Sequence, residues 1–171
     1  MNTEIEKVKI LSAGAITAKL KRMAFEIYER NFKEEELIFV SIGPRGEFLA
    51  KQLAVHMVEI SNLNISQLRL IKSESADDLN WQLPDAVSKI EGKTVIIVDD
   101  VLYSGKTMFT AVAEVVKGKP NGVQVAVLID RGHRTLPVSH DFVGMEMATS
   151  LKQYISMEVD SKTSRAAAYI F

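Results

Sequence analysis

The chain contains the run Val95-Ile96-Ile97-Val98-Asp99-Asp100-Val101-Leu102-Tyr103-Ser104-Gly105-Lys106-Thr107, in which an apolar strand passes into the start of a helix. The apolar residues before Asp99 are typical of a strand that is covered on both faces. Two adjacent carboxylates end the strand, and a short turn of small and polar residues follows. Apolar residues then recur at helical spacing from Met108 to Val116, so the turn opens an amphipathic helix.

This layout indicates a ligand that carries both a sugar and a phosphate. Carboxylates at the tip of a strand suit sugar hydroxyls or a divalent cation. Free backbone N–H groups and the dipole at a helix N-terminus suit a phosphate. The plainer alternative is a strand-to-helix turn with an aspartate as a solvated cap. A helix cap requires only one such side chain, so capping alone does not account for two aspartates followed by Ser-Gly-Lys-Thr.

Two other nucleotide motifs do not fit the run. Gly105-Lys106-Thr107 resembles the end of a P-loop, but that motif requires a glycine at position 100, where this chain has aspartate. A carboxylate there would repel the phosphates that a P-loop cradles. The dinucleotide-binding pattern G-x-G-x-x-G does not occur in the sequence.

The rest of the chain alternates between strands and helices. Helical spacing predicts helices over about 15–31, from Leu49 to Ile60, and over about 108–116. Apolar runs predict strands, and 72–89 reads as a long polar loop, in which Trp81 either anchors the loop or stacks on a ligand. The predicted strands are 37–42, 65–71, 94–99, 123–129, 142–147, 154–159 and 166–171. The alternation predicts one α/β domain over 1–171, with a central, mainly parallel sheet flanked by helices.

Three predicted loops follow strands of this sheet: 43–46, 99–107 and 130–134. Ligands of open α/β sheets bind outside the carboxyl ends of the strands, so we expect one site there. In Gly43-Pro44-Arg45-Gly46 the glycines allow a close approach and the arginine suits phosphate oxygens, although a plain turn fits equally well. Asp130 to Arg134 brings three basic groups together, as either a solvated turn or a patch that faces an anion or RNA.

Composition excludes several classes of protein. Hydrophobic residues make up 47% and charged residues 25% of the 171, as in ordinary globular proteins. The net charge of −1 gives no overall attraction to nucleic acid, so an RNA site would be a local patch. No apolar run reaches the ~18 residues of a membrane span, and no signal peptide is recognised. The absence of cysteine excludes disulfides, and we expect a cytoplasmic protein. No histidine is paired at zinc-ligand spacing.

The run from Val95 to Thr107 resembles the phosphoribosyl-diphosphate (PRPP) signature of type I phosphoribosyltransferases. Further segments are similar to the PyrR family, which comprises pyrimidine-operon attenuation regulators that also have uracil phosphoribosyltransferase activity. These segments are Lys21-Arg22-Met23-Ala24, Glu29-Arg30-Asn31, Leu128-Ile129-Asp130-Arg131-Gly132-His133-Arg134, Leu136-Pro137, Asp141-Phe142-Val143-Gly144 and Thr149-Ser150. The resemblance runs from about residue 12 to the end.

The resemblance implies a role for each predicted loop. Asp99 and Asp100 would bind the ribose hydroxyls and lie near a Mg²⁺ ion that arrives with PRPP, with no direct metal site on the protein. The 5-phosphate would bind to Tyr103, Ser104, Gly105, Lys106 and Thr107. The loop formed by Gly43, Pro44, Arg45 and Gly46 would face the diphosphate. Catalysis would rest on Asp99, Asp100 and Arg45.

The resemblance also implies a pyrimidine substrate. Purine enzymes of this type place an acid where this chain has Tyr103, and a phenol, whose usual pKa is near 10, is a poor base at neutral pH. We expect uracil and PRPP to give uridine monophosphate and diphosphate. The segment 72–89 corresponds to a flexible hood in PyrR-type relatives, but its first residues, Lys72 to Leu79, contain neither arginine nor tyrosine.

Family resemblance suggests Arg22, Arg30, His133 and Arg134 as an RNA or anion patch, with a leader hairpin of mRNA as the partner. We expect a homo-oligomer, a dimer or larger. Two alternatives to a uracil phosphoribosyltransferase remain open. In the first, the protein is an RNA-binding regulator. In the second, it binds PRPP or a nucleotide with little or no catalysis.

Overall fold

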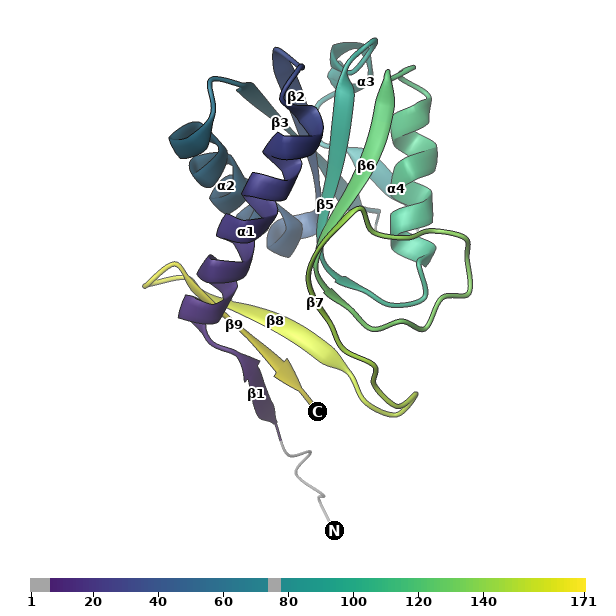
Figure 1. Ribbon diagram of the computed structural model, residues 1–171. Coiled ribbons are helices and arrows are strands. Elements are labelled where there is room, and N and C mark those ends of the chain that lie inside the picture. Colours follow the sequence, from purple (N-terminus) through teal and green to yellow (C-terminus); the bar gives the residue numbers. More distant parts are fainter. Residues whose placement is uncertain (1–6, 74–77) are drawn as a thin grey trace.

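The computed structural model describes residues 7–73 and 78–171 and shows an α/β fold (Figure 1). Its elements are β1 (Val8–Leu11), α1 (Ala13–Asn31), β2 (Glu36–Ile42), α2 (Gly43–Ile60), β3 (Asn64–Lys72), β4 (Leu79–Trp81), α3 (Ala86–Lys89), β5 (Thr94–Leu102), α4 (Lys106–Val116), β6 (Gly122–Asp130), β7 (Phe142–Glu146), β8 (Ile155–Asp160) and β9 (Arg165–Ile170).

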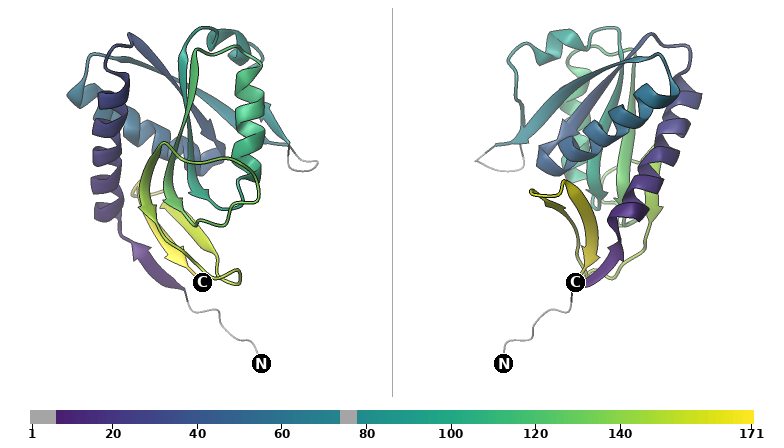
Figure 2. Two further views of the ribbon diagram at one scale, coloured as in Figure 1. Left: turned by 45° about the vertical axis from the view of Figure 1, so that its right-hand side comes forward. Right: turned by 90° about the vertical axis from the view of Figure 1, so that its left-hand side faces the viewer.

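A six-stranded sheet with the order β4-β3-β2-β5-β6-β7 forms the centre of the molecule. Neighbouring strands from β3 to β7 are parallel, and β4 pairs antiparallel with β3 at the edge. The predicted, mainly parallel sheet is therefore confirmed. In the left view of Figure 2, α1 lies on one side of this sheet and α4 on the other.

The buried strands supply both faces of the sheet with apolar side chains. Along β5, Ile96 and Val98 pack with α1 and α2, whereas Val95 and Ile97 pack with α4. This alternation explains why β5 reads as a continuous apolar run, because successive side chains of a strand point to opposite faces. Burial on both faces fixes the register that brings the carboxyl ends of the strands together.

A second, three-stranded antiparallel sheet has the order β1-β9-β8 and lies below the carboxyl ends of the main sheet in Figures 1 and 2. Leu11, Met157 and Ala168 from this sheet enter the same hydrophobic cluster as α1 and α2. We propose on this ground that 1–171 forms a single domain. Among the described residues, no helix is long and apolar enough to cross a membrane.

The structure corrects several expectations. The predicted loop 43–46 is the first turn of α2, because Gly43 has a φ of 61° and turns β2 directly into a helix with Pro44 near its start. The predicted loop 72–89 contains β4 and α3, while 74–77 lie outside the described residues. β1 was not expected. β8 and β9 were predicted as strands, and they form the small sheet together with β1.

Candidate functional site

A cavity of about 500 Å³ opens at the carboxyl ends of three adjacent strands, β3, β2 and β5. Two carboxylates from β5 and three cations from the neighbouring elements line it. They are Asp99, Asp100, Arg45, Arg69 and Lys72. The structure thus brings the predicted catalytic residues together, and it adds two cations that the sequence analysis did not include.

The two carboxylates reach the cavity because β2 ends before β5 does. β2 pairs with β5 only as far as Ser41 opposite Val98, and β2 then turns into α2. Asp99 and Asp100 therefore lie inside β5, which runs on to Leu102, and not at its tip as expected. Their β2 side is open, and the first turn of α2, with Arg45, lies across the gap.

Gly46 allows this close approach of α2 to β5. A Cβ atom at position 46 would lie 2.6 Å from the backbone oxygen of Val98 and 3.6 Å from the Cα of Asp99. A contact of 2.6 Å to backbone cannot be relieved by moving a side chain. The glycine thus sets the distance between the turn that carries Arg45 and the carboxylate pair.

The carboxylate pair is poorly satisfied by the protein itself. Asp99 Oδ1 accepts a hydrogen bond of 2.9 Å from the backbone N–H of Asp100. Asp100 Oδ2 is buried and has no hydrogen-bond partner among the described residues, and Arg45 Nη1 lies 3.6 Å from it. Burial, and then the negative charge of Asp100, raise the pKa of Asp99 well above its usual value. A ligand that brings hydrogen-bond donors or a cation would give Asp100 Oδ2 a partner and would lower the pKa of Asp99.

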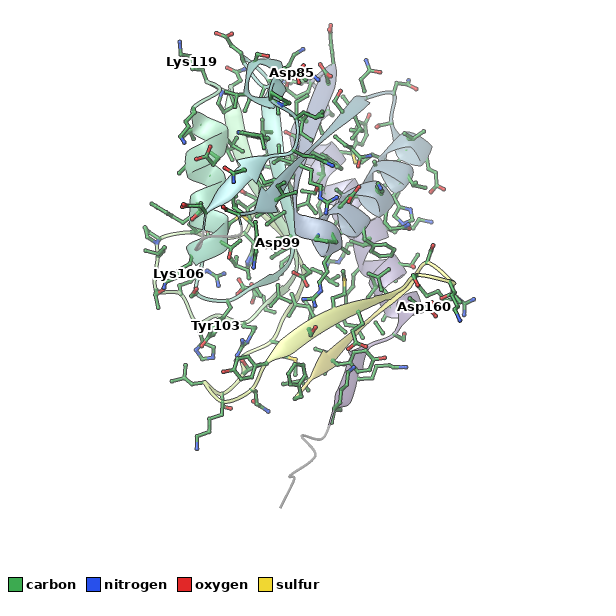
Figure 3. All side chains as sticks on the ribbon, turned by 180° about the vertical axis from the view of Figure 1, so that it is seen from behind. Asp85, Asp99, Tyr103, Lys106, Lys119 and Asp160 are labelled. Carbon is green, nitrogen blue, oxygen red and sulfur yellow. The ribbon has the colours of Figure 1, made fainter. Side chains whose placement is uncertain are left out.

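A smaller cavity of about 150 Å³ surrounds the start of α4 and also borders Asp99. Gly105 is the N-cap of α4 with a φ of 84°, in the left-handed region that favours glycine. The first turn of α4 contains no acidic residue, and the first N–H groups of a helix have no partner within the helix. Figure 3 labels Asp99, Tyr103 and Lys106 around this region. The predicted phosphate-binding residues therefore line a small hollow at a helix N-terminus, an end of a helix that favours anions.

The segment after β6 holds this turn in place. Arg131 N donates to Leu102 O at 2.9 Å, Thr135 N donates to Ser104 O at 3.0 Å, and Arg134 Nη1 donates to Tyr103 O at 3.1 Å. The buried guanidinium of Arg131 also lies 3.9 Å from the centre of the Tyr103 ring. These contacts hold the carbonyl groups of the turn, and the N–H of Lys106 donates to Ser104 Oγ at 3.4 Å.

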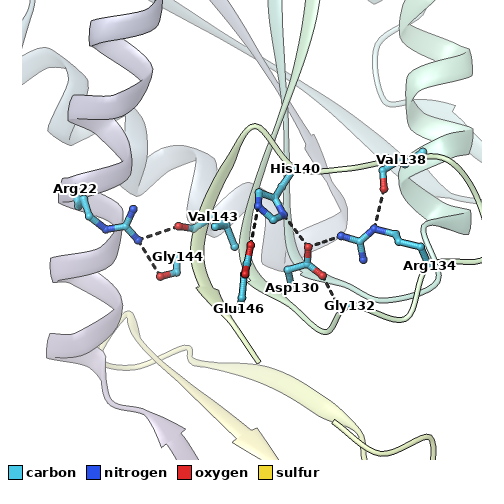
Figure 4. Close-up of polar contacts among 9 residues, drawn as sticks. All are labelled: Arg22, Asp130, Gly132, Arg134, Val138, His140, Val143, Gly144 and Glu146. Atoms are coloured by element: carbon cyan, nitrogen blue, oxygen red, sulfur yellow. Dashed lines mark hydrogen bonds and ion pairs between the residues drawn. The ribbon is translucent and has the colours of Figure 1, made fainter. Parts of the chain in front are cut away.

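The four residues of the predicted basic patch fall into two groups. Arg22 and Arg30 lie on α1, where Arg22 Nη2 donates to the carbonyl oxygens of Val143 and Gly144 at 2.8 and 2.9 Å. Arg30 pairs with Asp141 at 2.7 Å. Figure 4 shows Arg22 and Arg134 on opposite sides of β7.

The second group, His133 and Arg134, is turned inward. His133 Nε2 contacts the carbonyl oxygen of Thr149, and Arg134 pairs with Asp130. Asp130 also contacts His140 Nδ1 at 2.7 Å (Figure 4). Although burial raises the pKa of Asp130, the hydrogen bonds from Arg134 and from the N–H of Gly132 outweigh it and lower the pKa.

Arg69 and Lys72 could have been found by combining two sequence signals. Leu68 and Leu70 are apolar neighbours that predict one buried face of β3, which places Arg69 on the other face. Both cations lie near the carboxyl end of a strand that neighbours β2. The predicted site residues all came from loops at this edge, whereas Arg69 and Lys72 belong to the strand itself.

The fold and the site define a class of protein: an α/β protein with a carboxylate pair beside a helix N-terminus at the carboxyl ends of a parallel sheet. The chain belongs to the phosphoribosyl transferase domain family, whose sequence profile matches residues 8–162. Relatives called "Bifunctional protein PyrR" occur in Brevibacillus brevis, with 39% identity over 91% of this chain and 91% of the relative, and in a Geobacter species, with 37% identity over 89% and 90%. The resemblance to the PyrR family is thereby confirmed.

Solved structures confirm the fold at lower identity. A hypoxanthine-guanine phosphoribosyltransferase from Bacillus anthracis has a TM-score of 0.74 and 21% identity, covering 96% of this chain and 98% of that chain. The hypoxanthine phosphoribosyltransferase of Trypanosoma cruzi has a TM-score of 0.76 and 18% identity, covering 95% of both chains. At these identities the likeness concerns the fold and not the substrate.

Proposed function

We propose that this protein transfers ribose 5-phosphate from PRPP to uracil and releases diphosphate. One observation carries the proposal: the pair Asp99 and Asp100 borders both the large cavity and, through Asp99, the hollow at the start of α4. A ribose held by the two carboxylates would place its 5-phosphate in the small hollow. The diphosphate on the anomeric carbon would then extend into the large cavity.

Each part of PRPP has matching groups. The carboxylates accept hydrogen bonds from the two ribose hydroxyls, which are charge-assisted contacts. Ser104 to Thr107 offer backbone N–H groups and hydroxyls to the 5-phosphate, and the dipole of α4 favours its charge. Arg45, about half exposed at the start of α2, faces the leaving diphosphate.

The reaction breaks the bond between the anomeric carbon and the diphosphate oxygen, whose electron pair leaves with the diphosphate. N1 of uracil forms the new bond to that carbon and loses its proton, which the released diphosphate or water takes up. The sugar carries positive charge in the transition state, which the carboxylates of Asp99 and Asp100 stabilise. Arg45 stabilises the negative charge that develops on the diphosphate.

The carboxylate pair also fits Mg²⁺. Within 7–73 and 78–171, no three His, Cys, Asp or Glu side chains converge into a dedicated metal site. Mg²⁺ commonly binds through one or two carboxylates together with substrate phosphates and water. Asp100 Oδ2, buried without a hydrogen-bond partner in the described part of the chain, supports that arrangement. Bound there with PRPP, Mg²⁺ would supply charge neutralisation to the diphosphate.

Tyr103 supports a pyrimidine base. Its ring is held face-on by Arg131 at 3.9 Å and edge-on by His133, with ring centres 5.7 Å apart. A phenol held in this way offers no carboxylate to the nitrogen-rich edge of a purine.

An assay of diphosphate release tests the proposal. The protein is incubated with PRPP, Mg²⁺ and one base at a time: uracil, hypoxanthine or guanine. We expect release with uracil and little with the purines. Turnover of a purine with none of uracil would refute the choice of base. No release with any base would leave a PRPP-binding protein without catalysis.

We propose as a second activity that the protein binds a leader hairpin of mRNA. The word "Bifunctional" in the name of the relatives supports a second activity. Arg22 and Arg30 on α1 are about half exposed, although each pairs with a carboxylate, and they supply the positive charge for an RNA site. RNA affinity should fall with salt, and Arg22→Ala with Arg30→Ala should reduce both the affinity and the salt slope. Because Arg134 holds Tyr103 O, Arg134→Ala should weaken base transfer as well. Failure to retain the hairpin at low salt would remove this activity.

We further propose a homo-oligomer. Phe25 and Phe32 are 50% and 59% exposed and lie seven residues apart at the C-terminal half of α1 and just beyond it, so they share one face of the helix. Light scattering of the purified protein would measure its mass, and a monomer at high concentration would contradict this proposal. A cytoplasmic location, expected from the absence of cysteine, stays a prediction.

A further inference from the structure

We propose that Arg69 and Lys72 of β3 bind the diphosphate group of PRPP, together with Arg45. This inference rests on the proposed function and names the residues of its leaving-group side. Both residues line the same large cavity as the carboxylate pair. Neither belongs to the predicted diphosphate loop at 43–46.

The pattern of β3 points Arg69 into the cavity. Leu68 and Leu70 are buried in the cluster that packs against α4, so Arg69 between them projects from the other face of the sheet. Arg69 is paired with Ser41 in β2, two residues before the turn into α2. The guanidinium therefore lies beside the start of α2, on the same side of the sheet as Arg45.

The contacts of Arg69 hold it in place and leave donors free. Its Nη1 lies 2.7 Å from Glu47 Oε2, and its side chain is only 23% exposed. Its Nε is buried and has no hydrogen-bond partner among the described residues. A buried donor without a partner lowers the stability of the fold by about 1–3 kcal/mol. The ion pair with Glu47 alone therefore does not explain why Arg69 is placed here. A phosphate oxygen in the cavity would satisfy the donor.

Glu47 positions the guanidinium and does not neutralise the cavity. It is shared with Lys51, whose Nζ lies 2.8 Å from Oε1. The hydrogen bond from Lys51, and to a smaller extent the charge of Arg69, lower the pKa of Glu47, which stays ionised at neutral pH. Glu47 itself does not line the cavity, whereas Arg69 does.

Lys72 adds an exposed positive charge to the lining of the large cavity. It is exposed at the end of β3, and its charge is among the influences that act to lower the pKa of Asp99. Lys72 therefore lies close enough to the carboxylate pair to act on a group bound beside it. A flexible ammonium suits a diphosphate oxygen as a point charge, whereas Arg69 offers a planar fork.

The two cavities indicate the orientation in which PRPP binds. They share Asp99, Val101 and Thr107, so a ribose on the carboxylates spans them. With the 5-phosphate at the start of α4, the diphosphate lies in the larger cavity. Three cations, Arg45, Arg69 and Lys72, face it there.

Calorimetric titration with three probes tests the inference: PRPP, inorganic diphosphate and uridine monophosphate, each with Mg²⁺. The first two carry a diphosphate, whereas uridine monophosphate carries only the 5-phosphate. The variants are Arg69→Gln, Lys72→Ala and the double variant. We expect at least about tenfold weaker PRPP binding for Arg69→Gln and for the double variant, as for the loss of a charge-assisted hydrogen bond, and unchanged binding of uridine monophosphate.

Two further variants separate binding from structure. Lys51→Ala removes the other partner of Glu47 and should leave all three affinities unchanged. Arg69→Lys keeps the charge beside Glu47 but loses the planar fork, so PRPP binding should stay weakened. Lys72 is exposed, so Lys72→Ala is a test that cannot fail through misfolding.

The titrations distinguish this inference from the proposed function. Wild-type affinity for PRPP and diphosphate in the double variant would overturn the inference while leaving the proposed function intact. An equal loss for uridine monophosphate would also overturn it, because the damage would not be confined to the diphosphate. A wild-type protein that binds neither PRPP nor diphosphate would overturn both proposals.

Discussion

Gly46→Ala should damage both the fold and the site, because the added methyl group has no room. Its Cβ would lie 2.6 Å from Val98 O, a backbone atom in the centre of the sheet. Helix α2 must retreat by about 0.4–0.8 Å before that contact reaches the range of 3.0–3.4 Å. Arg45 moves with the helix and away from Asp100.

Overpacking of this kind costs about 1–3 kcal/mol of the free energy of unfolding. For a chain of this length, that lowers the melting temperature by about 2–12 °C. If Arg45 faces the leaving diphosphate as proposed, a displacement of its side chain approaching 1 Å should lower kcat/KM for PRPP by about tenfold or more. Thermal unfolding and the diphosphate-release assay measure the two effects.

Gly14→Ala is the matched control. Gly14 also lies in the first turn of a long helix, α1, but a Cβ atom there meets nothing within 4 Å. Alanine favours a helix over glycine by up to about 1 kcal/mol, so this variant should be as stable as the wild type or more stable. A Gly46→Ala protein with the wild-type melting temperature and activity would refute the argument that close packing sets the position of Arg45.

Asp99→Asn with Asp100→Asn should abolish PRPP binding in a folded protein, because each charge-assisted hydrogen bond from a ribose hydroxyl to a carboxylate is worth about 1.5–3 kcal/mol; unchanged affinity by calorimetry would contradict the ribose assignment. Gly105→Val should weaken uridine monophosphate and PRPP together, since a β-branched residue is strained at a φ of 84°; loss of only one ligand would exclude the shared phosphate site. Burial and the charge of Asp100 raise the pKa of Asp99 above its usual 3.8. The protonated carboxyl therefore stabilises the fold below that value, and this contribution is lost as the pH rises through the raised pKa. Asp99→Asn alone should thus raise the melting temperature at pH 8 and not at pH 3, and an equal effect at both would contradict the raised pKa.

The sequence predicted the elements that carry their own signal. The continuous apolar runs of β2, β5 and β6 and the helical spacing of α1, α2 and α4 are local patterns, and the structure confirms them. β1 and β4 were not predicted because they are only four and three residues long. Each forms a strand only because it pairs with a neighbour, β1 with β9 and β4 with β3. No local pattern contains that pairing.

The same limit applies to the site. Asp99, Asp100 and the turn into α4 follow one another in the chain, so the sequence predicts that they lie close together. Their place inside β5 was not predicted, because it depends on where the neighbouring strand β2 ends. Arg69 lies in a strand far from them, and only the register of β3 against β2 brings it to the cavity. The inward contacts of Arg134 with Asp130 and Tyr103 are likewise tertiary.

Strand β1 joins residues from opposite ends of the described chain, since Lys9 pairs with Tyr169. β8 and β9 form a hairpin across a short turn, in which Asp160 pairs with Arg165. Closing the long loop costs about 3 kcal/mol more chain entropy than closing that turn. β1 also has no partner in its sheet until β9 is in place. We therefore expect β1 to dock last during folding, with amides of Val8–Leu11 protected from hydrogen exchange later than those of β5.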